Sequence, residues 1–137
     1  MRLLSLTAAV AATTLMAGTA TAATNVSMWY HGAGNEVESN IINQIISDFN
    51  SSQSDYNVVL ESFPQESYND SVEAAALAGN LPCIIDVDGP VMPRWAWAGY
   101  MQPLPINQDL IADFLPGTKG IWGGELYSIG LWDAAVA

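Results

Sequence analysis

Apolar side chains recur along this chain with two different spacings, one typical of strands and the other typical of helices. Residues 25–30 place apolar side chains at every second position, which is typical of a strand. Residues 56–63 form a second run rich in strand-forming side chains, and Pro64 closes it. Residues 83–87 form a third run that is almost wholly apolar until its acidic end. Such a composition predicts a strand inside a sheet rather than at its edge.

Helical spacing fills the intervals between these strands. Asn35 can cap a helix, with Glu38 three residues on as its capping-box partner. The apolar side chains that follow form one stripe at helical spacing, which we expect to face the core: Val37, Ile41, Ile42, Ile45, Ile46 and Phe49. Residues 68–78 predict a second helix, with Ser67 as its cap and Gly79 as its left-handed stop.

The last third of the chain predicts shorter elements. Residues 93–98 form a short helix, in which Trp95 and Trp97 cannot both face the core. Residues 109–114 suggest a turn of helix, residues 121–127 a hairpin, and residues 129–132 a continuing strand. Strands that alternate with helices predict an α/β fold, a parallel sheet with helices on both faces.

The N-terminus has the features of a cleaved export signal. A basic start is followed by an apolar run over residues 3–17 and by the small-residue site Ala20-Thr21-Ala22. The alternative is a membrane anchor, but the run is shorter than the about 20 residues that a span requires. We therefore expect a signal peptide over residues 1–22, no membrane insertion after cleavage, and a periplasmic protein. No cysteine follows the cleavage site, which argues against a lipid anchor.

The charge of the chain limits its possible partners, and its cysteine content limits its possible disulfides. The chain has 3 basic and 14 acidic residues and a net charge of −11. This balance argues against binding to nucleic acid or anionic lipid, both of which need a basic face. Cys83 is the single cysteine, so no internal disulfide can form, and its apolar neighbours predict a small buried side chain.

The sequence lacks the motifs of common enzyme classes. It has no G-x-S-x-G motif, its single histidine is too few for a usual zinc site, and residues 31–34 lack a phosphate-binding glycine pattern. Asp86 and Asp88 lie about 6–7 Å apart on one strand face, and no partner acid for glycoside hydrolysis is identifiable. We expect no catalysis, no cofactor and no metal.

Four segments of the chain form an ordered set, at residues 25–31, 75–82, 98–104 and 124–130. In this order they resemble segments of the family 1 extracellular solute-binding proteins, which are the sugar receptors of ABC importers. Residues 25–31 resemble the family's first strand, and residues 75–82 its small-residue stretch ending in Gly-x-x-Pro. Residues 98–104 are similar to its G-x-L-x-P-L element. Residues 124–130 resemble its G-K-x-Y-G-x-P hairpin more loosely, because Glu125, Ser128 and Gly130 replace the family residues.

This resemblance implies a receptor of the type II periplasmic-binding-protein fold. Such receptors have two α/β lobes joined by a hinge, bind a sugar or polyol between the lobes, and dock on the membrane subunits of an ABC permease. Residues 23–137 would then form part of the N-terminal lobe. The apolar ending at residues 134–137 suggests a chain that stops within a domain. The complete protein is expected to be a monomer.

A sugar site needs aromatic rings for the sugar faces and polar groups for the hydroxyls, placed just past the strand ends. Asp88 follows the third strand, and its alternative role is to cap the next turn. His31 ends the first strand, and it could instead be structural. Glu36 lies in a first helical turn, where the helix dipole alone favours an acid.

Three further side chains complete the predicted substrate-binding set. Tyr68 begins the second helix, where related receptors often use a tyrosine, and its alternative is a packed aromatic. Trp132 and Asp133 follow the last strand and could form a platform of ring and carboxylate. Asp86 is interpreted as a solvated acid at a strand end rather than as a second ligand.

Two alternative functions remain open. One is a non-functional, truncated remnant of such a receptor, which would expose apolar faces. The other is a secreted carbohydrate-active enzyme, against which the missing acid pair argues. Because both lobes enclose the ligand in this family, we expect this chain alone to bind sugar in the millimolar range or not at all.

Overall fold

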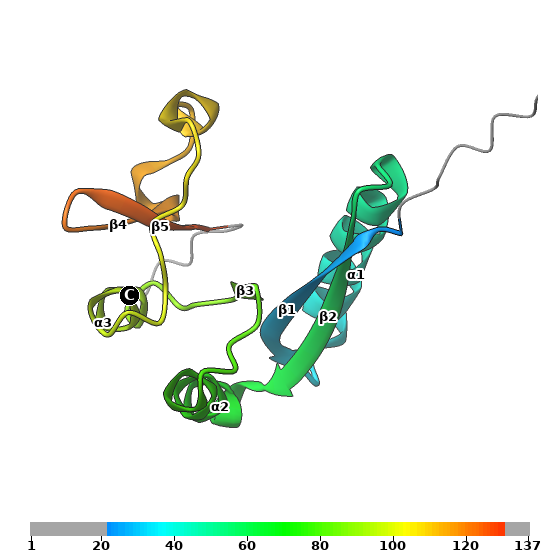
Figure 1. Ribbon diagram of the computed structural model, residues 1–137, viewed down its shortest axis with the longest axis horizontal. Helices are drawn as coiled ribbons and strands as arrows, with labels where there is room; N and C mark the ends of the chain where they lie inside the picture. The colour runs from blue at the N-terminus through cyan, green and yellow to red at the C-terminus, as the bar shows by residue number, and fades with distance from the viewer. Residues whose placement is uncertain (1–21, 131–137) are drawn as a thin grey trace, which may run out of the picture.

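A three-stranded parallel sheet with helices on both faces forms the centre of the computed structural model, which describes residues 22–130 (Figure 1). Its strands are β1 (Thr24–Ala33), β2 (Tyr56–Pro64) and β3 (Ile84–Ile85), in the order β2-β1-β3. Helices α1 (Glu36–Ser52) and α2 (Gln65–Ala78) connect them. Both partners of β1 run parallel to it, so the predicted α/β architecture is confirmed.

The alternation of β1 divides the core between the two faces of the sheet. Trp29 lies on the α2 face, where its ring is 4.7 Å from Phe63 and packs against the buried cluster around Tyr68. Tyr30 points to the opposite face, where its hydroxyl donates to Glu38 of α1 at 3.2 Å. Two consecutive residues of β1 therefore pack against the helices on opposite faces of the sheet.

The ends of the helices were predicted with mixed success. The Asn35 side chain accepts from the Glu38 N–H, and Gly79 adopts a left-handed φ of 70° at the end of α2, as predicted. The start of α2 was predicted wrongly, because the helix begins at Gln65 directly after Pro64. Ser67 is not its cap but donates from within the first turn to the Pro64 carbonyl.

The apolar stripe of α1 only partly faces the sheet, which corrects the prediction of one core-facing stripe. Ile42 is 2% exposed, so one edge of the stripe is buried. A second row at four-residue spacing is exposed, and we call it the outer row: Val37, Ile41, Ile45 and Phe49. Within residues 22–130 this row is covered only in part, since Val37 is 70% exposed and Phe49, the least exposed of the four, is still 42% exposed.

The third strand is shorter than predicted and lies at a sheet edge. Only Ile84 and Ile85 pair with β1, and within the described residues no further strand pairs with the other side of β3. Ile84 is therefore 41% exposed, and Cys83 is exposed rather than buried as predicted. The apolar composition of the run was identified correctly, but the neighbours it implies are not in the described chain.

The remaining elements agree with the predictions that fall on them. Helix α3 (Met92–Trp97) buries Trp95 and leaves Trp97 78% exposed. The 3-10 helices η1 (Gln108–Ile111) and η2 (Pro116–Thr118) lead to the hairpin of β4 (Lys119–Trp122) and β5 (Glu125–Ile129). Gly123 and Gly124 both have positive φ, as the tight hairpin turn requires.

Two predictions concern the ends of the chain. The signal peptide falls mostly on residues outside the described range. Of the strand predicted over 129–132, Ile129 ends β5, Gly130 is not in a strand, and residues 131 and 132 lie outside the described range. Among residues 22–130, no helix combines the length and the hydropathy needed to cross a bilayer.

Candidate ligand-binding site

A cavity of about 330 Å³ opens where β1 and β2 end and where α1 and α2 begin. Open α/β sheets bind their ligands at this carboxyl end, since parallel strands bring loops distant in sequence to one rim. The lining combines a tight loop with acids, amides and an imidazole: His31, Gly32, Ala33, Gly34, Asn35, Glu38, Gln65 and Glu66.

Hydrogen bonds from Asn35 and α1 hold the end of β1 in place. The Gly32 carbonyl accepts from the Asn35 N–H at 3.1 Å and from the Ser39 hydroxyl at 3.0 Å. Gly32 cannot carry a side chain here, because a Cβ atom would overlap the ring of Tyr30. These contacts fix the floor of the cavity before any ligand arrives.

Glu38 forms one wall of the cavity and is oriented by Tyr30. Burial, reinforced by the nearby Glu38 carboxylate, raises the pKa of Tyr30 to about 12, so its hydroxyl remains a donor at physiological pH. The bond uses Oε2 of Glu38. No hydrogen bond within residues 22–130 occupies Oε1.

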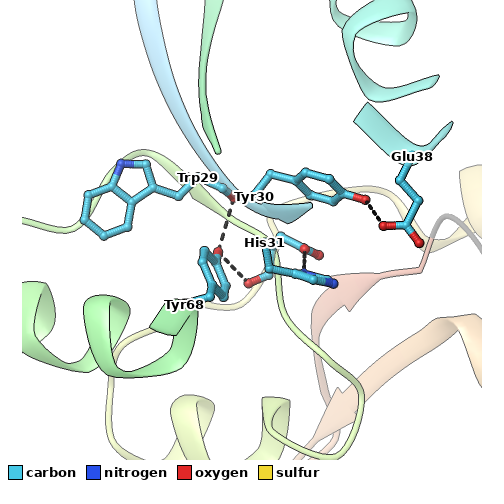
Figure 2. Close-up of polar contacts among 6 residues, drawn as sticks. Trp29, Tyr30, His31, Glu38 and Tyr68 are labelled. Carbon is cyan, nitrogen blue, oxygen red and sulfur yellow. Dashed lines mark hydrogen bonds and ion pairs between the residues drawn. The ribbon is translucent and has the colours of Figure 1, made fainter. Parts of the chain in front are cut away.

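Behind the cavity, hydrogen bonds and an ion pair join the ends of β1 and β3 (Figure 2). The Tyr68 hydroxyl lies 3.2 Å from the Trp29 carbonyl and 2.9 Å from the Asp86 carbonyl. The Asp86 N–H donates to the same Trp29 carbonyl at 3.0 Å. His31 Nδ1 forms an ion pair with Asp86 Oδ2, a buried oxygen that has no other partner among the described residues.

Burial shapes the ionisation of this group. Desolvation raises the pKa of the Asp86 carboxyl above its ordinary value of 3.8, and the adjacent His31 opposes that shift. Burial, followed by the Asp86 charge, also raises the pKa of Tyr68, so its phenol stays protonated. Asp86 was predicted to be a solvated acid, but it is a partly buried ion-pair partner.

The structure brings some of the predicted site residues to the cavity and not others. His31 lines it, and Glu36 is exposed at the first position of α1 but is not among the lining residues. Tyr68 is 2% exposed and lies in the core, which is the packed alternative. Trp132 and Asp133 lie outside the described residues.

Asp88 lies past β3 with an exposed side chain. Its carbonyl accepts from the N–H groups of Val91 and Met92. The side chain does not cap α3, because Val91 is the N-cap residue and makes no side-chain cap bond. The role of Asp88 in binding therefore stays a prediction.

Four lining residues with polar side chains were not predicted as site residues. Asn35 and Glu38 were identified only as a capping box, and Gln65 and Glu66 were placed before the second helix. All four are polar side chains at the start of a helix that directly follows a strand. These positions lie at the same edge of the sheet as His31, which was predicted from its place at a strand end.

A second hollow, of about 540 Å³, follows the free edge of β3, and we call it the β3 groove. It is lined mainly by apolar and backbone groups of residues 81–85, residues 99–105 and Tyr127. In the described part of the chain, no group of three or more His, Cys, Asp or Glu side chains could hold a metal ion.

Searches with family models and against curated proteins gave no match for the chain. The fold, a parallel sheet with flanking helices, matches part of a solute-binding protein. One similar solved structure is the cyclic alpha-maltosyl-1,6-maltose binding protein from Arthrobacter globiformis. The similarity has a TM-score of 0.64 at 19% identity and covers 75% of this chain. This chain spans 27% of the length of that protein.

Proposed function

We propose that the protein is a family 1, sugar-type solute-binding protein, the component of an ABC importer that binds a sugar or polyol and delivers it to a membrane permease. The observation that carries this proposal is the cavity at the carboxyl end of the sheet. Its carboxylate, amide and imidazole groups supply the acceptors and donors that hydroxyl groups require. The similar fold of a protein named for binding a maltosyl-maltose supports a carbohydrate as the ligand.

The proposal includes export by a cleaved signal over residues 1–22, a periplasmic location and a monomeric complete protein. The apolar run and the small-residue site at the N-terminus support export. We propose no catalytic role, because the similar solved structure is a binding protein.

We also propose that residues 23–137 are part of the N-terminal lobe of a two-lobed receptor. The outer row of α1 and the β3 groove are apolar surfaces of the kind that further polypeptide covers in a complete domain. The same exposed surfaces favour a second candidate, a truncated remnant that no longer binds ligand.

Titration of the chain from residue 23 to residue 137 with maltose and other neutral sugars tests the proposal. In two-dimensional NMR of ¹⁵N-labelled protein, a receptor lobe shows saturable shifts of the Gly32, Gly34 and Asn35 amides with millimolar affinity, and the sugars are recovered unchanged. A remnant shows no saturable shift with any of them. Micromolar binding by this chain alone would contradict the need for a second lobe, and turnover of a sugar would contradict a binding role.

A matched pair of variants separates the cavity from the overall charge of the protein. Glu66→Gln removes an exposed carboxylate from the cavity lining, and Glu61→Gln removes an exposed carboxylate of β2 that does not line it. A hydrogen bond to a charged group contributes about 1.5 kcal/mol or more, so we expect Glu66→Gln to weaken sugar binding about tenfold. Equal effects of both variants would assign the loss to net charge and not to the site.

A further inference from the structure

His31 is the single histidine of the chain, and its ring lies where three elements meet. It extends from β1 into the cavity lining, and its Nδ1 faces the Asp86 carboxylate that follows β3. The ring of Tyr30 lies 5.2 Å away and that of Tyr68, from α2, lies 5.8 Å away. Two aromatic neighbours and one carboxylate therefore define the orientation of the imidazole.

The carboxylate is itself held in place by backbone contacts. The Asp86 N–H donates to the Trp29 carbonyl, and the Asp86 carbonyl accepts from the Tyr68 hydroxyl. These bonds fix the residue on both sides of its Cα atom. The ion pair uses Nδ1 of His31, and no hydrogen bond or ion pair within residues 22–130 engages the second ring nitrogen, Nε2.

We infer that Asp86 is a positioning residue, which keeps a proton on His31 Nδ1 and presents His31 Nε2 to a ligand hydroxyl in the cavity. The hydrogen bond at one imidazole nitrogen decides which nitrogen is protonated, and a carboxylate acceptor at Nδ1 selects the Nδ1–H form. Nε2 then accepts from a hydroxyl when the ring is neutral and donates to one when the ring is charged. A hydroxyl can serve both states. The ligand-facing part of this inference rests on the proposed function.

Other titratable groups near the imidazole could also influence its protonation, so the test compares variants in which these groups are kept. Glu38 of α1 and Glu66 of α2 line the same cavity, Asp88 follows β3, and Tyr30 and Tyr68 flank the ring as protonated phenols. Because these groups are the same in every variant below, a difference between variants reports on Asp86.

The test uses NMR of the single imidazole in the ¹⁵N-labelled chain, whose nitrogen shifts distinguish the two neutral tautomers. We expect the Nδ1–H form in the wild type, the Nε2–H form in Asp86→Ala, and recovery of part of the Nδ1–H population in Asp86→Asn, whose amide oxygen can still accept. Asp55→Ala, which removes an exposed carboxylate at the opposite end of the sheet, leaves the tautomer unchanged.

The wild-type spectrum decides the matter even if Asp86→Ala fails to fold, because an Nε2–H tautomer in the wild type overturns the inference. An unchanged tautomer in a folded Asp86→Ala variant overturns it as well.

Addition of maltose then tests the ligand-facing part. We expect the Nε2 resonance to shift in the wild type, and Asp86→Ala to bind about tenfold more weakly than Asp55→Ala. If the cavity amides shift while Nε2 does not, the ligand-facing role of His31 is wrong and the proposed function stands. If no sugar shifts any resonance, the proposed function fails, and the tautomer measurement alone still decides whether Asp86 positions the ring.

Discussion

The Tyr68 hydroxyl lies between two strand ends, where it can donate to the carbonyls of both Trp29 and Asp86. Tyr68→Phe leaves the buried ring in place and removes the shared donor. We expect a loss of about 1–2 kcal/mol in the free energy of unfolding, because buried acceptors lose their partner. Urea denaturation measures this loss. Tyr56→Phe, at a residue that is 52% exposed, is the control and should change stability by less than about 0.5 kcal/mol.

Asp86 gives the stability a pH dependence of unusual sign for a carboxyl group. Its pKa is raised in the folded state, so the folded protein keeps this proton to higher pH than the unfolded chain does. Its contribution is therefore fully present below pH 3.8, the ordinary pKa, and is lost as the pH rises through the raised value.

Comparison of the wild type with Asp86→Asn measures this contribution together with the interaction of Asp86 with His31, because no other titratable group is replaced. We expect the stability of the wild type relative to the variant to fall as the pH rises from 3.8, as measured by thermal unfolding at a series of pH values. A relative stability that rises over this range would show that the His31 ion pair outweighs the desolvation of the carboxyl group.

Helix α1 allows a comparison of two isoleucines within one element. Ile42→Ala removes a buried side chain and should cost about 2–4 kcal/mol. Ile45→Ala truncates the same side chain in the outer row, where 48% of the residue is already exposed, and should cost less than about 1 kcal/mol. Chemical denaturation of both variants checks the difference. Similar losses would mean that the outer row is covered in solution.

Local pattern was sufficient to predict the type of most elements, including the hairpin at Gly123-Gly124 and the helix stop at Gly79. Local pattern failed to predict burial, because the burial of a side chain depends on which other elements pack against it. Hydrophobic spacing indicates an apolar side of α1, but it does not say that Ile42 is covered while Ile45 is open. In the same way, the apolar run of β3 predicted buried neighbours that the described chain does not contain.

The sequence predicted the location of the candidate site, at the carboxyl ends of the strands, but not the contacts that its side chains make. Parallel strands place their ends together, so His31 was expected near the third strand end, where it meets Asp86. The side-chain directions of Glu66 and Tyr68 depend on where α2 begins, and Pro64 starts that helix earlier than the sequence suggested. As a result, Glu66 lines the cavity and Tyr68 enters the core.

At the scale of the whole molecule, an exposed apolar row coexists with a net charge of −11. Charge repulsion opposes contact between copies, and salt weakens that repulsion because the Debye length falls from about 10 Å at 0.1 M to about 3 Å at 1 M. We therefore expect the chain from residue 23 to residue 137 to self-associate more at high salt. Light scattering at increasing sodium chloride concentration measures this, and Ile41→Gln with Ile45→Gln should suppress it. Association that declines with salt would contradict an apolar interface.

The exposed thiol of Cys83, next to the unpaired edge of β3, can report whether that edge is covered. A maleimide reagent should modify it within the time that an unfolded cysteine peptide requires, since no described strand shields it. Any polypeptide that extends the sheet past β3 would slow this alkylation. The rate of a one-step labelling reaction can therefore show whether the sheet edge is open, without a new structure.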